Sequence, residues 1–96
     1  MAQLSGKTQP HQTPLERILA ELVAARERIR QLMELIRQKE LQLKQLMDQY
    51  QVDHSELQLQ QLQQVASELA AARNELRQQE EVVKQKLKQL QQLENP

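Results

Sequence analysis

The chain has 96 residues, equal numbers of basic and acidic side chains, one Tyr, and no Phe, Trp or Cys. The absence of Cys excludes a disulfide framework, a thiolate nucleophile and a Cys-based metal site. A compact globular core usually relies on aromatic side chains, and only Tyr50 could contribute here. Leu, Ala, Val, Ile and Met among many Gln, Glu, Lys and Arg are typical of coiled coils when they recur periodically.

Residues 1–13 contain Gly6, Pro10 and several Gln and Thr without apolar periodicity. We expect this segment to be a disordered N-terminal tail. It lacks the apolar stretch of a secretory signal, and no segment has the roughly eighteen consecutive apolar residues of a membrane span. A cytoplasmic or nuclear location is therefore expected.

Three signals at one place mark the start of a first helix, predicted over residues 14–51. Thr13 can accept a hydrogen bond as the N-cap, and Pro14 suits the first helical position. Glu16 completes a Thr-x-x-Glu capping box. The predicted coiled-coil domain, residues 14–94, begins here.

Two rows with a seven-residue period follow, and their alternating spacing of three and four keeps one stripe facing a partner helix. The first row is Leu15, Leu22, Ile29, Ile36, Leu43, Tyr50 and Leu57. The second row is Ile18, Ala25, Leu32, Lys39, Leu46 and Asp53.

The period breaks between Leu57 and Leu62, a step that neither a three- nor a four-residue insertion explains. The break follows residues 52–55, which are poor helix formers. We expect a turn over 52–55 and a second helix over 55–94. Its rows are Leu62, Leu69, Leu76, Val83 and Leu90, then Val65, Ala72, Gln79, Lys86 and Leu93.

The predicted fold is therefore all-α, an antiparallel two-helix hairpin in a coiled coil. Pairing residues whose numbers add to about 108 aligns the apolar rows, for example Leu32 with Leu76. It also sets residues 1–50, with a formal charge of +2, against residues 51–96, with a charge of −2. The alternative is one continuous helix about 120 Å long in a parallel dimer.

Further apolar residues flank the rows and widen the stripe beyond a two-helix seam. They are Leu19, Met33, Leu35, Met47, Val82 and Leu87. We therefore expect self-association into a four-helix arrangement, or docking on the helices of another coiled-coil protein. The predicted interface comprises Leu15, Ile18, Leu22, Ile29, Leu32, Ile36, Leu43, Leu46, Tyr50, Leu57, Leu62, Val65, Leu69, Leu76, Val83, Leu90 and Leu93.

The rows also contain polar residues, namely Lys39, Gln79 and Lys86. The preferred interpretation is that the Lys stems lie along the seam and reach water with their charged ends. The alternative is that these residues fix the register and the choice of partner.

No group of residues indicates catalysis, so we expect no enzyme activity, no cofactor, no metal site and no small-molecule substrate. His11 and His54 are the only His residues, and a metal site needs several convergent ligands. The concentration of Arg at positions 26, 28, 30 and 37 is interspersed with Glu, and no aromatic platform for bases accompanies it. We expect neither nucleic-acid nor membrane binding.

The expected function is that of a coiled-coil interaction protein, an oligomerisation, adaptor or scaffold subunit. One alternative is a regulatory or chaperone-like module that masks a partner's helix. Another is a transcription-associated dimeriser, although residues 1–13 hold only one Lys where a basic segment would be required.

Overall fold

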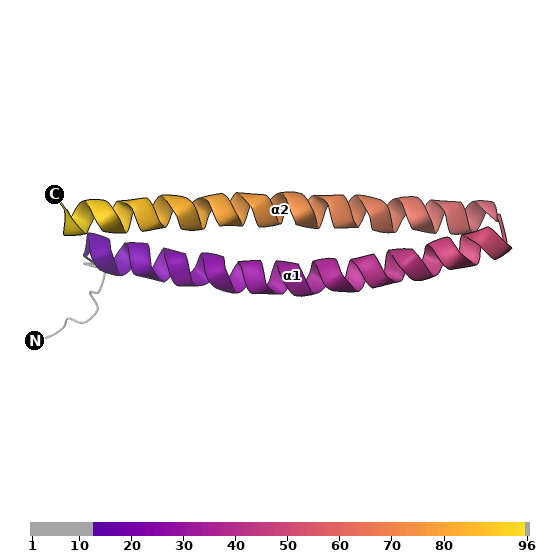
Figure 1. Ribbon diagram of the computed structural model, residues 1–96, viewed down its shortest axis with the longest axis horizontal. Helices are drawn as coiled ribbons and strands as arrows, with labels where there is room; N and C mark the ends of the chain where they lie inside the picture. Colours follow the sequence, from indigo (N-terminus) through magenta and orange to yellow (C-terminus); the bar gives the residue numbers. More distant parts are fainter. Residues whose placement is uncertain (1–12, 96) are drawn as a thin grey trace, which may run out of the picture.

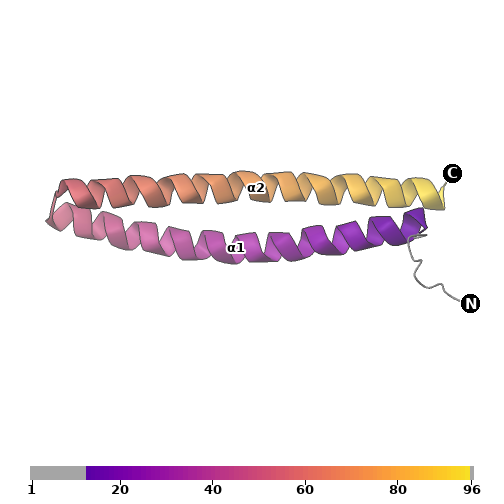
Figure 2. The same ribbon diagram turned by 180° about the vertical axis from the view of Figure 1, so that it is seen from behind.

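The computed structural model describes residues 13–95, which contain two α-helices, α1 (Pro14–Val52) and α2 (Glu56–Glu94). The helices run antiparallel and lie side by side over their length (Figure 1), and the view from behind agrees (Figure 2). The predicted helical hairpin is confirmed, and the alternative of one continuous helix is wrong. Neither helix has a window apolar enough to cross a bilayer. Of the tail expected over residues 1–13, all but Thr13 lies outside the described residues.

The start of α1 has the predicted capping box. The Thr13 Oγ1 accepts a hydrogen bond from the Glu16 N–H at 3.1 Å, and the Thr13 N–H donates to the Glu16 Oε1 at 3.0 Å. Pro14 occupies the first helical turn, where a missing N–H costs nothing. Two N–H groups at this end, which the helix itself leaves without partners, are thereby satisfied.

The turn between the helices consists of three residues, Asp53 to Ser55. The Asp53 N–H still donates to the Gln49 carbonyl at 2.9 Å, but its backbone has left the helical region. Ser55 then caps α2, because its Oγ accepts from the Gln58 N–H at 3.1 Å. Val52 thus completes α1, and Ser55 precedes α2, so each boundary lies one residue from the expected position.

The turn explains why the hairpin closes without Gly or Pro. No residue in the described part of the chain has a positive φ, the conformation for which Gly is usually required. The chain reverses over Asp53 to Ser55 with extended backbone at both Asp53 and Ser55. The rings of Tyr50 and His54 lie 4.8 Å apart, centroid to centroid, and tilt by 57°. This contact packs the turn against the last turns of α1.

The core is a narrow seam between the two helices. Its most buried side chain is Leu32, of which 1% is exposed. The buried apolar residues of the described chain are Ile18, Leu22, Ala25, Leu32, Val65, Leu69 and Ala72. All of them belong to the two pairs of rows, so the seven-residue period gives the buried stripe.

Ion pairs between the helices report the register directly. Within residues 13–95, four such pairs join α1 to α2: Arg28–Glu75, Lys39–Glu68, Glu40–Arg73 and Glu21–Lys86. Their residue numbers add to 103, 107, 113 and 107, which bracket the expected 108. The predicted register is therefore the one observed.

The same pairs distinguish this register from its neighbours. Sliding one helix by seven residues keeps the apolar rows in phase, so hydrophobic burial alone discriminates weakly. After a slide in one direction, Lys39 opposite Glu75 would be the only attractive pair of the four, and Glu40 would lie opposite Glu80. After a slide in the other direction, Arg28 opposite Glu68 would be the only attractive pair. The charged residues therefore select one register among those, seven residues apart, that the apolar rows fit equally well.

Candidate helix-binding surface

The predicted interface is used largely inside one molecule, where α1 meets α2. Five of its residues are buried: Ile18, Leu22, Leu32, Val65 and Leu69. Nine are half-buried: Ile29, Ile36, Leu43, Leu46, Tyr50, Leu62, Leu76, Val83 and Leu90. Three are exposed: Leu15, Leu57 and Leu93. In the hairpin the seam is thus largely covered by α1 and α2 themselves, and the exposed Leu and Met residues Leu19, Met33, Met47 and Leu87 lie beside it.

Leu57 does not continue the row of α1. It is 64% exposed, and Gln58 instead occupies the seam position seven residues before Val65. A heptad row carries meaning only within one continuous helix, and the turn at residues 53–55 resets its phase. Gln58 is half-buried, and its side-chain oxygen is buried without a hydrogen-bond partner in the described part of the chain.

The two long sides of the hairpin differ in chemistry. We call one the polar side, because it carries Arg28–Glu75, Lys39–Glu68 and Glu21–Lys86, three of the four interhelical pairs found within residues 13–95. We call the other the apolar side, because Leu19, Met33, Met47 and Leu87 lie on it beside the single pair Glu40–Arg73. Their helical positions place these four beside the seam on the side of Glu40, between 43% and 58% exposed.

A groove between the helices lies on each side, and both linings mix apolar with charged or amide residues. On the apolar side, Leu43, Met47 and Leu69 line a shallow groove of about 300 Å³ near the turn, together with Glu40, Lys44, Asp48, Gln51 and Arg73. On the polar side, Glu21, Arg28 and Lys86 line a separate groove together with Gln79 and Val82. The sequence analysis grouped Leu35 and Val82 with the other flanking apolar residues. Their heptad positions would have separated them. Leu35 and Val82 come one residue before a member of the first row, whereas the residues of the apolar side come one residue after a member of the second row.

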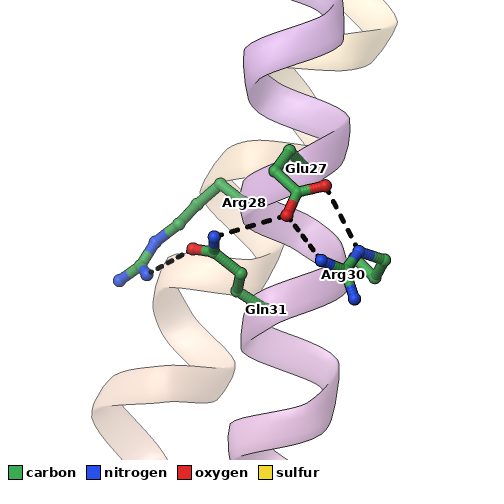
Figure 3. Close-up of polar contacts among 4 residues, drawn as sticks. All are labelled: Glu27, Arg28, Arg30 and Gln31. Carbon is green, nitrogen blue, oxygen red and sulfur yellow. Dashed lines mark hydrogen bonds and ion pairs between the residues drawn. The ribbon is translucent and has the colours of Figure 1, made fainter.

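Arg28 connects the polar side to a network on the surface of α1. Its Nη1 donates to the Gln31 Oε1 at 3.3 Å, and the Gln31 Nε2 donates to the Glu27 Oε2 at 3.4 Å. Arg30 donates to both oxygens of Glu27, at 3.2 and 2.6 Å (Figure 3). The hydrogen bond from Arg30 lowers the pKa of the Glu27 carboxyl below its ordinary value. The network links the Arg28 guanidinium, which donates to Glu75 of α2, to Glu27 and Arg30 on the surface of α1.

The two Lys residues of the seam end on carboxylates of the opposite helix. The Lys39 Nζ lies 2.6 Å from the Glu68 Oε1, and the Lys86 Nζ lies 2.6 Å from the Glu21 Oε1. Both Lys side chains are largely covered, since 24% and 21% of their surface is exposed. Their stems lie along the seam as expected, but the charges are paired between helices. The observed arrangement thus favours the alternative in which they fix the register.

Three of the four Arg residues in the basic segment are already paired within the chain. Arg28 pairs with Glu75, Arg30 with Glu27, and Arg37 with Glu34. Arg26 is the member that has no ion-pair partner among residues 13–95. It is also the member whose helical position lies on the apolar side, seven residues from both Leu19 and Met33.

The described part of the chain brings no three His, Asp or Glu side chains close enough together to hold a metal ion. His54 lies in the turn against Tyr50, and His11 lies outside the described residues. Half-exposed Leu and Met residues and a row of interhelical charges lie on opposite sides of the hairpin. No family model, no curated protein and no solved structure matches the chain.

Proposed function

We propose that the chain is a non-enzymatic interaction protein, an oligomerisation or adaptor subunit that binds other helices on its apolar side. The single observation that carries this proposal is the row of half-exposed Leu and Met residues beside the seam. We place this activity in the cytoplasm or the nucleus, the compartments expected from the sequence.

The energetics support a surface that is incomplete in the isolated hairpin. Fully burying a Leu or Met side chain contributes about 1.5–3 kcal/mol. Leu19, Met33, Met47 and Leu87 still expose roughly half of their surface, so each would contribute on the order of 1 kcal/mol when covered. Another helix laid on this side supplies that cover. The polar side offers a smaller gain. Leu35, 37% exposed, and the half-buried Val82 are the apolar residues flanking the seam there, and the other flanking positions carry charged or amide side chains that water already solvates.

Position-specific photo-crosslinking in the cells that produce the chain tests the proposal. A photoactivatable aliphatic residue replaces either Met33, on the apolar side, or Leu41, on the outward face of α1. The two side chains are equally exposed, at 58%, and belong to the same helix, so exposure alone cannot produce a difference between them.

Adducts with a helical chain from position 33, and few from position 41, support the proposal. Equal labelling at the two positions, or none at position 33, overturns it. Circular dichroism separates the adaptor function from the masking of a partner's helix. If the isolated chain has little helix and folds only with its partner, masking is the function.

A further inference from the structure

The apolar side of α1 carries a row in which apolar residues are placed symmetrically about the centre and the two charged residues have opposite signs. Residues seven apart read, in order, Leu19, Arg26, Met33, Glu40 and Met47. Apolar residues occupy the two ends and the middle, and opposite charges occupy the two places between them. Successive members are about 10.5 Å apart along the helix axis, because each residue adds about 1.5 Å.

A two-fold axis through Met33, perpendicular to α1, makes this row complementary to itself. In a second copy that runs antiparallel, Leu19 faces Met47, Met33 faces Met33, and Arg26 faces Glu40. Each charge therefore meets its opposite and each apolar residue meets another. Such a contact is isologous, with both copies using the same patch.

Other arrangements of two hairpins lose this match. Two α1 helices in parallel set Arg26 on Arg26 and Glu40 on Glu40, so like charges oppose each other. Packing α1 of one copy on α2 of the other in the register of one hairpin brings Met33 to the level of Glu80. In the antiparallel arrangement the two Glu80 side chains, one from each α2, lie at the same central level. Because their like charges oppose each other, the closest contact falls between the α1 helices.

The charges on this side are suited to the contact. Arg26 has no ion-pair partner among residues 13–95, and Glu40 accepts from the Arg73 Nη2 of its own chain at 2.6 Å. The antiparallel copy would place its Arg26 near that carboxylate as well. One carboxylate has lone pairs for two guanidinium groups. Leu19 of the second copy would meet the groove formed by Leu43, Met47 and Leu69.

We propose that a second copy of this chain covers the apolar side in this antiparallel, two-fold arrangement, giving a four-helix bundle in which each Arg26 pairs with the other chain's Glu40. The inference rests on the proposed function and adds the identity and orientation of the partner. The available area is of the required order. The α1 helix, about 60 Å long and about 10 Å wide, presents roughly 600 Å². The neighbouring part of α2, which carries Leu87, would supply the rest of the about 800 Å² that a stable interface takes from each partner.

Charge reversal tests the inference in the purified chain by sedimentation equilibrium at about 0.05 M salt, where charges are weakly screened. The parent should have twice the 11.3 kDa mass of one chain. Arg26→Glu and Glu40→Arg, each alone, place like charges in both symmetric contacts, so we expect the dimer dissociation constant to rise at least tenfold. Arg17→Glu is the matched control, since it makes the same charge change at an exposed position off this side.

Mixing the two variants is the diagnostic step. A heterodimer of Arg26→Glu with Glu40→Arg has opposite charges at both contacts, so the mixture should recover the dimer mass that neither variant has alone. Circular dichroism at the same concentration checks that each variant remains helical. A monomeric parent, an unchanged dissociation constant for Arg26→Glu, or a mixture that stays monomeric overturns the inference. Adducts from position 33 that contain only another protein would overturn it while leaving the proposed function intact.

Discussion

Arg28 holds Glu75 by two parallel hydrogen bonds across the hairpin, from Nε to Oε2 at 2.7 Å and from Nη2 to Oε1 at 2.9 Å. This bidentate geometry fixes distance and angle together, which a single point charge does not do. It raises the pKa of the Arg28 guanidinium and lowers that of the Glu75 carboxyl, chiefly through the hydrogen bonds themselves. The pair therefore acts as a clamp on the polar side of the hairpin.

Arg28→Lys should lower the melting temperature, because Lys retains the charge but makes only one directed contact. We expect a small decrease, since both side chains are well exposed to water, at 43% and 38%. Arg37→Lys is the control, because the Glu34 partner of Arg37 lies on the same helix. Thermal unfolding followed by circular dichroism measures both. Equal shifts would show that the interhelical pair has no role in closing the hairpin.

Leu32→Ala should lower the free energy of unfolding by about 2–5 kcal/mol, the usual cost of removing a buried Leu side chain. Leu32 is the most buried residue of the seam, and its removal leaves a cavity between the helices. Leu41→Ala, on the outward face of α1, should change the free energy by less than about 0.5 kcal/mol. Urea unfolding at one fixed protein concentration compares them, because association adds to apparent stability. Similar losses for both variants would contradict the seam.

Ser55→Ala should destabilise the chain by about 0.5–2 kcal/mol, because the Gln58 N–H loses the acceptor that caps α2. Ser67→Ala is the matched control within α2, where Ala is the better helix former and no cap is lost. Amide hydrogen exchange provides a local measurement. The Gln58 amide should exchange faster in Ser55→Ala only, and unchanged exchange would mean that the cap contributes nothing in solution.

The features that the sequence alone predicted are those with local causes. Thr13, Pro14 and Glu16 fixed the start of α1 because a capping box is encoded within four residues. The seven-residue rows identified the buried stripe, since helical geometry alone decides which residues share a face. Their alignment then followed, and the four interhelical ion pairs bear it out.

The features that the sequence did not predict depend on positions in space. The exposure of Leu57 follows from the backbone angles at Asp53 and Ser55, which set how α2 is rotated after the turn. The partners of Lys39 and Lys86 lie on the opposite helix, 29 residues and 65 residues away in the chain. The sequence analysis expected the charged ends of Lys39 and Lys86 to reach water, because it considered only their own helix. Their partners Glu68 and Glu21 become evident only when the two helices are paired.

Acidification should destabilise the hairpin through carboxylates on the polar side. Hydrogen bonds from Lys39 to Glu68 and from Arg28 to Glu75 lower the pKa of both carboxyls below the ordinary value of 4.5. Between that value and the lower pKa of the folded state, the unfolded chain binds protons that the folded chain does not. Falling pH therefore favours unfolding in this window, and the contribution present above about pH 5 is lost as the folded carboxyls protonate.

The melting temperature should accordingly be nearly constant between about pH 7 and 5 and should fall below about pH 4.5. Glu68→Gln combined with Glu75→Gln should have a lower melting temperature at pH 7 and a shallower fall in acid. Glu81→Gln is the control, because its partner Lys84 is 3.9 Å away on the same helix. If the double variant and Glu81→Gln show the same slope, the acid sensitivity does not arise from the interhelical pairs.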